Sequence, residues 1–187
     1  AGAAVAWEDA SAGASALGSL DDVTMDATNF VDSLLIQPDS DGSAPTTGTL
    51  SSATGNLGIG KDCLAALTSG TYNVALGYEA SDAMTTGANN VAIGQDALGG
   101  NTTGSDNIAI GQAALDVPDT ESNNIAIGPN ALGGAVAGGE QNIAIGANAG
   151  DELTSGDSNV IIGFDAGHSV TTAYEDVLIG FDAGSEI

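Results

Sequence analysis

The phrase Asn142-Ile143-Ala144-Ile145-Gly146 recurs with small changes through the last two-thirds of this 187-residue chain. Its eight copies start at Asn56, Asn73, Asn90, Asn107, Asn124, Asn142, Asn159 and, in a variant form, Asp176. Successive starts are 17 residues apart, except for one interval of 18 that fits a one-residue loop insertion. So regular a period indicates a repeat architecture in which each unit packs against its neighbours.

The composition favours thin, stacked units over one large core. The chain has 28 glycines but only three Phe, three Tyr and one Trp. Each unit contains a short strand, a glycine bend, a second short strand and a polar turn, which is one coil of a parallel β-solenoid or β-roll. A helix is disfavoured because Gly, Asn and β-branched residues are dense. The sequence therefore predicts an all-β fold of about eight 17-residue coils.

Three segments are expected. Residues 56–187 form the solenoid, a rod on the order of 40 Å long because stacked strands rise about 4.8 Å each. Residues 21–55 contain the strand-like runs Val23-Thr24-Met25 and Leu34-Leu35-Ile36 and are predicted to be a small β-rich cap or connector. Residues 1–20 are predicted to be a small-residue arm or linker. The absence of an obvious cap before Ile187 suggests that more protein follows.

The strand positions predict an inner and an outer face. With Asn as position 0, the large aliphatic residues at +1 and +3, such as Ile108 and Ile110, are expected to point into the coil. Position +2 then points outward. It is occupied by Ala75, Ala92, Ala109, Ala126, Ala144, Ile161 and Leu178. An outward apolar row predicts contact with further copies, most simply in a homotrimer; the alternative is a tolerated surface row.

Two other positions have expected structural roles. The Asn side chains at position 0 are expected to stack as a hydrogen-bonded ladder, a role favoured over ligand binding. They are Asn73, Asn90, Asn107, Asn124, Asn142 and Asn159. Glycine at +4 predicts a bend with positive φ or a closely approached backbone. This column contains Gly77, Gly94, Gly111, Gly128, Gly146, Gly163 and Gly180.

The charge excludes several classes of partner. With 25 acidic residues against one basic residue, the net charge is −24, which argues against nucleic acid and against anionic membranes. No apolar run approaches the roughly 20 residues of a membrane helix.

Acidic residues also raise the question of Ca²⁺ or Mg²⁺. The +6 column contains Asp62, Glu79, Asp96, Asp165 and Asp182, but Ala113, Asn130 and Asn148 interrupt it, which favours an exposed turn over a cation ladder. Asp39 and Asp41 resemble the start of a calcium loop that lacks its terminal Glu. No cofactor is expected, and a bound divalent cation is left open.

No catalytic constellation emerges. His168 is the single histidine, so it would have to act alone as a catalytic base. Cys63 is the single cysteine, so no intrachain disulfide can form. The dense carboxylates contain no distinctive acid pair. The chain is therefore expected not to be an enzyme.

Two families resemble parts of the repeat. Asn90-Val91-Ala92-Ile93-Gly94-Gln95-Asp96-Ala97 resembles the head repeat of trimeric autotransporter adhesins, which implies a left-handed β-roll and a trimer. The longer unit Asn101-Thr102-Thr103-Gly104-Ser105-Asp106-Asn107-Ile108-Ala109-Ile110-Gly111 more closely resembles repeats of tail-fibre and virion appendage proteins of marine bacteriophages, including cyanophages. The 17-residue unit is longer than typical adhesin repeats, which favours the phage resemblance.

The phage resemblance implies a fibre or spike on a virion, in contact with other virion proteins and a host-surface receptor. A bacterial cell-surface adhesin or extracellular filament is the alternative. An ice- or polysaccharide-binding solenoid and a depolymerase rank below both, because Thr pairs fall in turns and no acid pair stands out.

Overall fold

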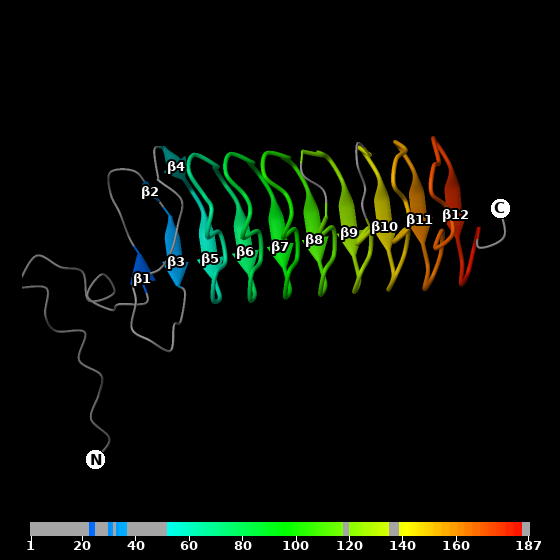
Figure 1. The fold of residues 1–187 in the computed structure, drawn as a ribbon, viewed down its shortest axis with the longest axis horizontal. Coiled ribbons are helices and arrows are strands. Elements are labelled where there is room, and N and C mark those ends of the chain that lie inside the picture. Colours follow the sequence, from blue (N-terminus) through cyan, green and yellow to red (C-terminus); the bar gives the residue numbers. More distant parts are fainter. Residues whose placement is uncertain are drawn as a thin grey trace, which may run out of the picture.

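The protein is a rod of stacked β-coils (Figure 1). The computed structural model describes residues 23–24, 30–31, 33–36, 52–117, 120–134 and 139–184, and these residues contain strands and turns but no helix. The eight repeat strands are β5 (Leu57–Ile59), β6 (Val74–Leu76), β7 (Val91–Ile93), β8 (Ile108–Ile110), β9 (Ile125–Ile127), β10 (Ile143–Ile145), β11 (Val160–Ile162) and β12 (Val177–Ile179). The predicted all-β parallel solenoid is confirmed.

The repeat strands form one parallel sheet in strict register. Ile108, Ala109 and Ile110 pair with Ile125, Ala126 and Ile127, so equivalent positions lie side by side. The register survives the 18-residue interval, because Ile143 still pairs with Ile125. The extra residue is therefore absorbed outside the strands.

The sheet continues into the segment before Asn56. Strands β1 (Val23–Thr24), β2 (Phe30–Val31), β3 (Leu34–Ile36) and β4 (Ala53–Thr54) lie there. Strand β3 pairs in parallel with β5, and β1 pairs antiparallel with β3. Strands β2 and β4 pair with each other in a separate two-stranded sheet. The Ser33 hydroxyl accepts the Asn56 N–H at 2.8 Å, so Ser33 stands where later coils have Asn. Residues 1–20 and the calcium-loop candidates Asp39 and Asp41 lie outside the described residues.

The inner and outer faces are the reverse of those predicted. The +2 side chains lie inside the coil, and all are fully buried except that of Leu178, which is partly buried against the core. These inward residues are Ala75, Ala92, Ala109, Ala126, Ala144, Ile161 and Leu178. The +1 and +3 side chains face outward instead. The predicted +2 interface is wrong because each strand has only three residues and its central side chain alone points into a narrow interior.

The opposite wall of the coil supplies the rest of the core. Small residues at +7 and leucines at +8 are fully buried there, among them Ala97 and Leu98. The second short strand predicted for this wall is wrong: these residues form a turn. Asp96 and Leu98 both have φ of 55°, a left-handed conformation that interrupts an extended run and is sparsely populated by non-glycine residues. Coil-to-coil bonds persist, as between Leu98 N–H and Ala114 O at 2.9 Å.

Large +2 residues fill the space beside the glycines of the opposite wall. In the coil that starts at Asn142, +8 is Gly150 while +2 is still Ala144, and a Cβ at Gly150 would lie 3.0 Å from Ile161 Cδ1 of the next coil. A Cβ at Gly167 would lie 3.1 Å from Ile161 Cγ2, and a Cβ at Gly184 would lie 2.9 Å from Leu178 Cδ1. The larger side chains at +2 therefore keep the interior closely packed where +8 is glycine.

The +4 glycines before Gly180 meet both expected conditions, and Gly180 meets only that of positive φ. Those from Gly77 to Gly180 have φ between 132° and 147°, which L side chains rarely adopt. A Cβ at Gly94 would also lie 2.4 Å from Gly111 O in the next coil. This column is where the chain leaves the sheet and adjacent backbones approach each other closely.

Candidate functional site

A buried asparagine column fixes the height of every coil. Asn90 accepts the Asn107 N–H on its Oδ1 at 2.9 Å, and its own Nδ2 donates to Gly104 O at 2.9 Å. The Asn90 side chain thus forms one hydrogen bond to the next coil and one to the polar turn of its own coil. Asn107, Asn124, Asn142 and Asn159 repeat both contacts. These bonds hold the outer face flat.

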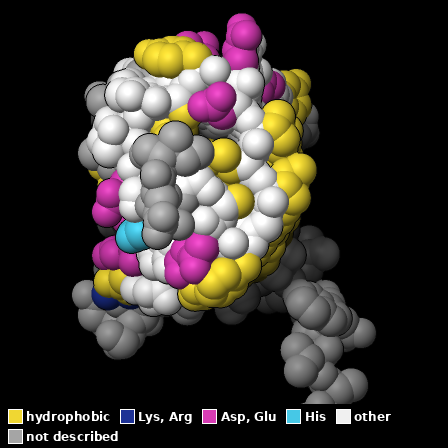
Figure 2. All heavy atoms as spheres, turned by 90° about the vertical axis from the view of Figure 1, so that its right-hand side faces the viewer, with side chains coloured by type: hydrophobic (Ala, Val, Ile, Leu, Met, Phe, Trp, Pro, Cys, Tyr) yellow, Lys and Arg dark blue, Asp and Glu magenta, His cyan; other side chains and the backbone are white. Residues whose placement is uncertain are grey.

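The outer face of the sheet is an array of aliphatic side chains, which we call the aliphatic face. Its two columns are Leu57, Val74, Val91, Ile108, Ile125, Ile143, Val160 and Val177 at +1, and Ile59, Leu76, Ile93, Ile110, Ile127, Ile145, Ile162 and Ile179 at +3. Along the rod these side chains are half-buried to exposed. Figure 2, viewed along the rod axis from the β12 end, shows hydrophobic side chains gathered on one side.

Exposed side chains flank this face at both strand ends. The N-rim, at position −1, consists of Tyr72, Asn89, Asp106, Asn123, Gln141, Ser158 and Glu175. The C-rim, at +5, consists of Lys61, Tyr78, Gln95, Gln112, Pro129, Ala147, Phe164 and Phe181. Among the residues of both rims only Lys61, Asp106 and Glu175 carry a charge, in a chain with 25 acids. A nearly neutral strip therefore runs the length of a strongly acidic rod.

Aromatic residues of the C-rim follow the coil repeat. Phe164 and Phe181 stack with ring centroids 5.6 Å apart and planes inclined by 8°. At β12 the aliphatic face is most open, with Val177 66% and Ile179 64% exposed. The face and its rims thus form one continuous apolar-to-neutral surface.

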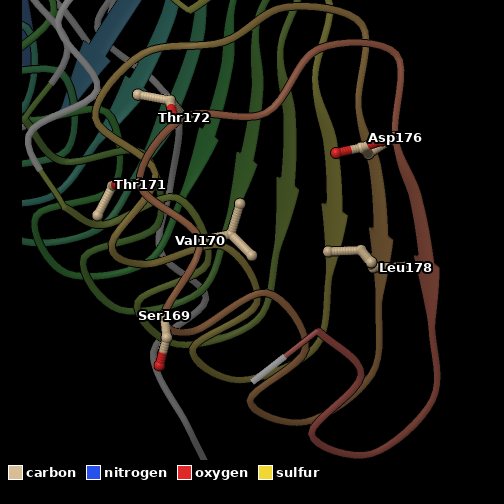
Figure 3. Close-up of a pocket in the computed structure, with 6 residues that line it drawn as sticks. All are labelled: Ser169, Val170, Thr171, Thr172, Asp176 and Leu178. Carbon is tan, nitrogen blue, oxygen red and sulfur yellow. The ribbon is translucent and has the colours of Figure 1, made fainter. Parts of the chain in front are cut away.

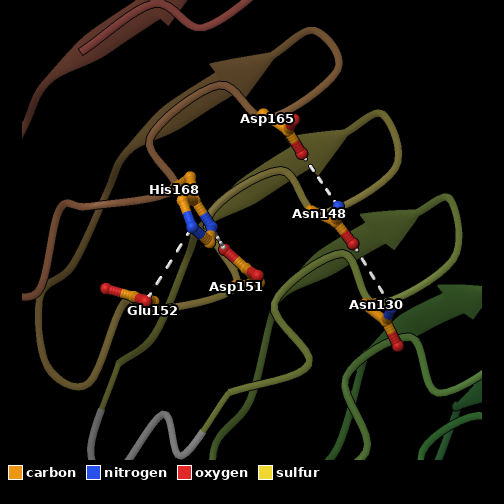
Figure 4. A network of polar contacts seen from close by, with 6 residues as sticks. All are labelled: Asn130, Asn148, Asp151, Glu152, Asp165 and His168. Carbon is orange, nitrogen blue, oxygen red and sulfur yellow. Dashed lines mark hydrogen bonds and ion pairs between the residues drawn. The ribbon is translucent and has the colours of Figure 1, made fainter. Parts of the chain in front are cut away.

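The acidic +6 column lies beyond the C-rim and is partly linked by amides. Asn130 Nδ2 donates to Asn148 Oδ1 at 3.2 Å, and Asn148 Nδ2 donates to Asp165 Oδ1 at 2.8 Å (Figure 4). Here the residues that interrupt the acids connect one coil to the next. Among the described residues, no group of three or more His, Cys, Asp and Glu side chains is placed to hold a metal ion.

His168 is part of a contact between two coils. Its Nδ1 lies 2.7 Å from Asp151 Oδ1, and its Nε2 lies 3.9 Å from Glu152 Oε1 (Figure 4). The hydrogen bond with Asp151 is the main reason that the pKa of His168 is raised above its usual value. His168 and Asp151 both occupy position +9 of successive coils, so the pair links coils in the same way as the amides do.

Two carboxylates earlier in the +9 column converge on one gap. A Cβ at Gly99 would lie 2.5 Å from Asp116 Oδ1 and 3.5 Å from Asp82 Oδ1. Burial is the first cause of the raised pKa of both aspartates, the charge of nearby Asp96 raises both pKa values further, and Asp82 also raises the pKa of Asp116. Only a residue without a side chain fits between them.

A shallow pocket lies between the last turn and β12. It measures about 240 Å³ and is lined by Ser169, Val170, Thr171, Thr172, Asp176 and Leu178 (Figure 3). Ligand sites for small molecules are usually larger, roughly 300–1,000 Å³. We assign no ligand to this pocket.

Comparisons with protein families, with curated proteins and with solved structures found no match. The described residues contain no helix long and apolar enough to cross a membrane. The sequence predicts that the +1 and +3 residues of the aliphatic face lie inside the coil, but they lie on its outer surface. This exposed face is the feature of the rod that points to a function.

Proposed function

We propose that this chain is a structural rod that associates with copies of itself through the aliphatic face, forming a homotrimeric fibre or spike of a virus particle. The observation that carries the proposal is the nearly neutral, aliphatic strip on a chain of net charge −24. Monomeric proteins rarely leave an apolar patch of this extent open to water.

The size of the strip suits a stable interface. Eight coils at about 4.8 Å and the six residue steps from one rim to the other at about 3.3 Å give an area of roughly 38 by 20 Å, or about 750 Å². This is close to the ~800 Å² that each partner buries in a standard interface. Three copies around a common axis would cover every aliphatic face and leave the acidic turns in solvent.

Electrostatics favours this arrangement over other self-contacts. The +6 and +9 carboxylates lie off the strip, and charges farther apart than the ~8–10 Å Debye length are largely screened at physiological salt. Copies that meet through the strip therefore avoid most of their mutual repulsion. A contact through the acidic turns would not.

The virion assignment rests on the resemblance of the 101–111 unit to phage fibre repeats and on the rod shape. Peptide mass spectrometry of purified virus particles tests it: recovery of this chain with the structural proteins is the expected result. Recovery from a bacterial envelope fraction, and not from particles, would instead support the adhesin or filament alternative. No divalent cation is part of the proposal.

A further inference from the structure

We propose that the β12 end of the rod binds an extended, basic segment of a different protein, which joins the sheet as a strand parallel to β12. The inference concerns the end of the rod and not the aliphatic face along its length, so it goes beyond the proposed self-association and does not depend on it. The partner segment has aliphatic residues between flanking Lys or Arg residues.

The two ends of the main sheet differ. At the first end β1 pairs antiparallel with β3 over two residues, so the parallel repeat stops there. At the other end β12 is the last strand, and no described residue pairs with its far edge. Its sequence, Val177-Leu178-Ile179, contains neither a charge nor a proline, the residues that commonly prevent an edge strand from pairing. The edge of β12 can therefore accept another strand.

The polar groups of the last coil repeat groups that bind the next coil elsewhere in the rod. One coil earlier, the Val160 N–H donates to Asp176 O at 2.9 Å, and Asn159 Oδ1 accepts the Asp176 N–H at 3.0 Å. The equivalent groups of the last coil are the Val177 N–H and the Asp176 carboxylate. An added strand would accept from the first and donate its own N–H to the second. Because Asp176 is an acid, the second bond is charge-assisted and stronger than a bond to an asparagine.

The pocket beside this edge suits one aliphatic side chain of the added strand. Val170 and Leu178 line it on the apolar side, and Figure 3 shows both near Asp176. Within the rod, a +2 side chain reaches back to the preceding coil: a Cβ at Gly150 would lie 3.0 Å from Ile161 Cδ1 of the next coil. The central side chain of an added strand would reach back in the same way and enter the pocket.

The charges at this end favour a basic partner. Glu175 and Asp176 precede β12, Asp182 follows it, and all three are exposed. Figure 2, which faces this end, shows acidic side chains around it. Lys61, in the first repeat coil, is the single Lys or Arg of the 187 residues, so a second copy is poorly suited to neutralise these carboxylates. A foreign strand with a basic residue on each side would do so, while its main chain supplies affinity and its central side chain specificity.

A synthetic peptide tests the site. The end-blocked peptide Lys-Asn-Ile-Leu-Ile-Gly-Phe-Lys continues the repeat, with Leu for the pocket, Phe to extend the stack of Phe164 and Phe181, and Lys at each acidic flank. Binding of the fluorescein-labelled peptide to the 187-residue chain is measured by anisotropy. Saturable binding is expected, with roughly tenfold slower exchange of the Val177 and Ile179 amides at saturating peptide. No binding, or slower exchange only along β5 to β11, would overturn the proposal.

Matched variants test the charge of the partner in about 0.1 M salt, where charges beyond about 10 Å are largely screened. Glu175→Gln/Asp182→Asn should weaken binding about fivefold. Asp62→Asn/Glu79→Gln removes the same charge in the first repeat coils, also at positions of positive φ, and should change binding by less than about twofold.

The identity of the partner is tested by two further results. A peptide with Glu in place of both Lys residues should bind about fivefold more weakly, and equal binding would overturn the basic partner. End-to-end growth of rods without peptide would assign the site to a second copy and would also overturn the proposal. The proposed trimer would stand after either result, because it uses the aliphatic face.

Discussion

The Asn107 N–H donates to Asn90 Oδ1 at 2.9 Å, across one turn of the solenoid. Because both residues are buried, this bond has no access to competing water. It sets the height of one coil above the last, and its repetition along the chain gives the outer sheet its strict register.

Replacing Asn107 with Ala should therefore destabilise the rod. The change removes the acceptor of the Asn124 N–H and the donor to Glu121 O. Two buried polar groups left without partners cost about 1–3 kcal/mol each, so a loss of about 2–6 kcal/mol is expected in urea unfolding. Thr103→Ala, at an exposed turn position without positive φ, should change stability by less than about 0.5 kcal/mol. Equal effects would contradict the ladder.

A second prediction concerns the close approach of the coils at the +4 column. Gly94→Ala places a Cβ 2.4 Å from Gly111 O, whereas a Cβ at Gly180 meets only Ala183 Cβ at 3.9 Å. Both positions have nearly the same φ, 137° and 135°, so their backbone strain is matched. Thermal unfolding should show a lower Tm for Gly94→Ala than for Gly180→Ala. Similar losses would mean that φ alone, and not crowding, requires glycine.

His168 should titrate above its usual value. Its bond to Asp151 favours the charged ring, so the pKa of His168 is raised in the folded protein. The resulting stabilisation is complete below the unfolded pKa of about 6.5 and is lost as pH rises through the folded pKa. Because His168 is the only histidine, NMR of its ring proton gives the pKa directly. Asp151→Asn should lower it, and an unchanged pKa would contradict the contact.

The ionised carboxylate of Asp116 should destabilise the folded protein at neutral pH. Burial and nearby carboxylates raise its pKa in the folded state, so the ionised form is disfavoured by folding. Asp116→Asn should raise the Tm at pH 7. The gain should vanish below the unfolded pKa of about 3.9, where the wild-type carboxyl is protonated in both states. A gain that persists at pH 3 would point to packing and not to charge.

Much of the fold could be predicted from the sequence because its signals are local and periodic. The spacing from Asn73 to Asn90 equals one turn of the solenoid, and the parallel register follows from it. The start of the sheet at Ser33 was harder to recognise, since serine replaces asparagine there and the next interval is longer.

The predicted direction of the strand side chains is wrong for a physical reason. The alternation of residues predicts large aliphatic residues such as Ile108 inside and Ala109 outside, as in a single-sided sheet. However, Asn107 and Ala109 share one face of the strand, and a column of stacked amides is sheltered from water only inside the coil. A small residue at +2 also leaves room for Leu115 on the opposite wall. These two signals were present in the sequence.

The mass of the particle in solution tests the central claim most directly. Light scattering of the chain at tens of micromolar should give three times 18.1 kDa. The double variant Ile110→Asp/Ile127→Asp, which puts charges on the aliphatic face, should reduce it to one times that mass. Thr86→Asp/Thr103→Asp, with equal added charge at exposed turn positions, should leave it trimeric. A wild-type protein that stays at 18.1 kDa with its β-structure intact would contradict the account.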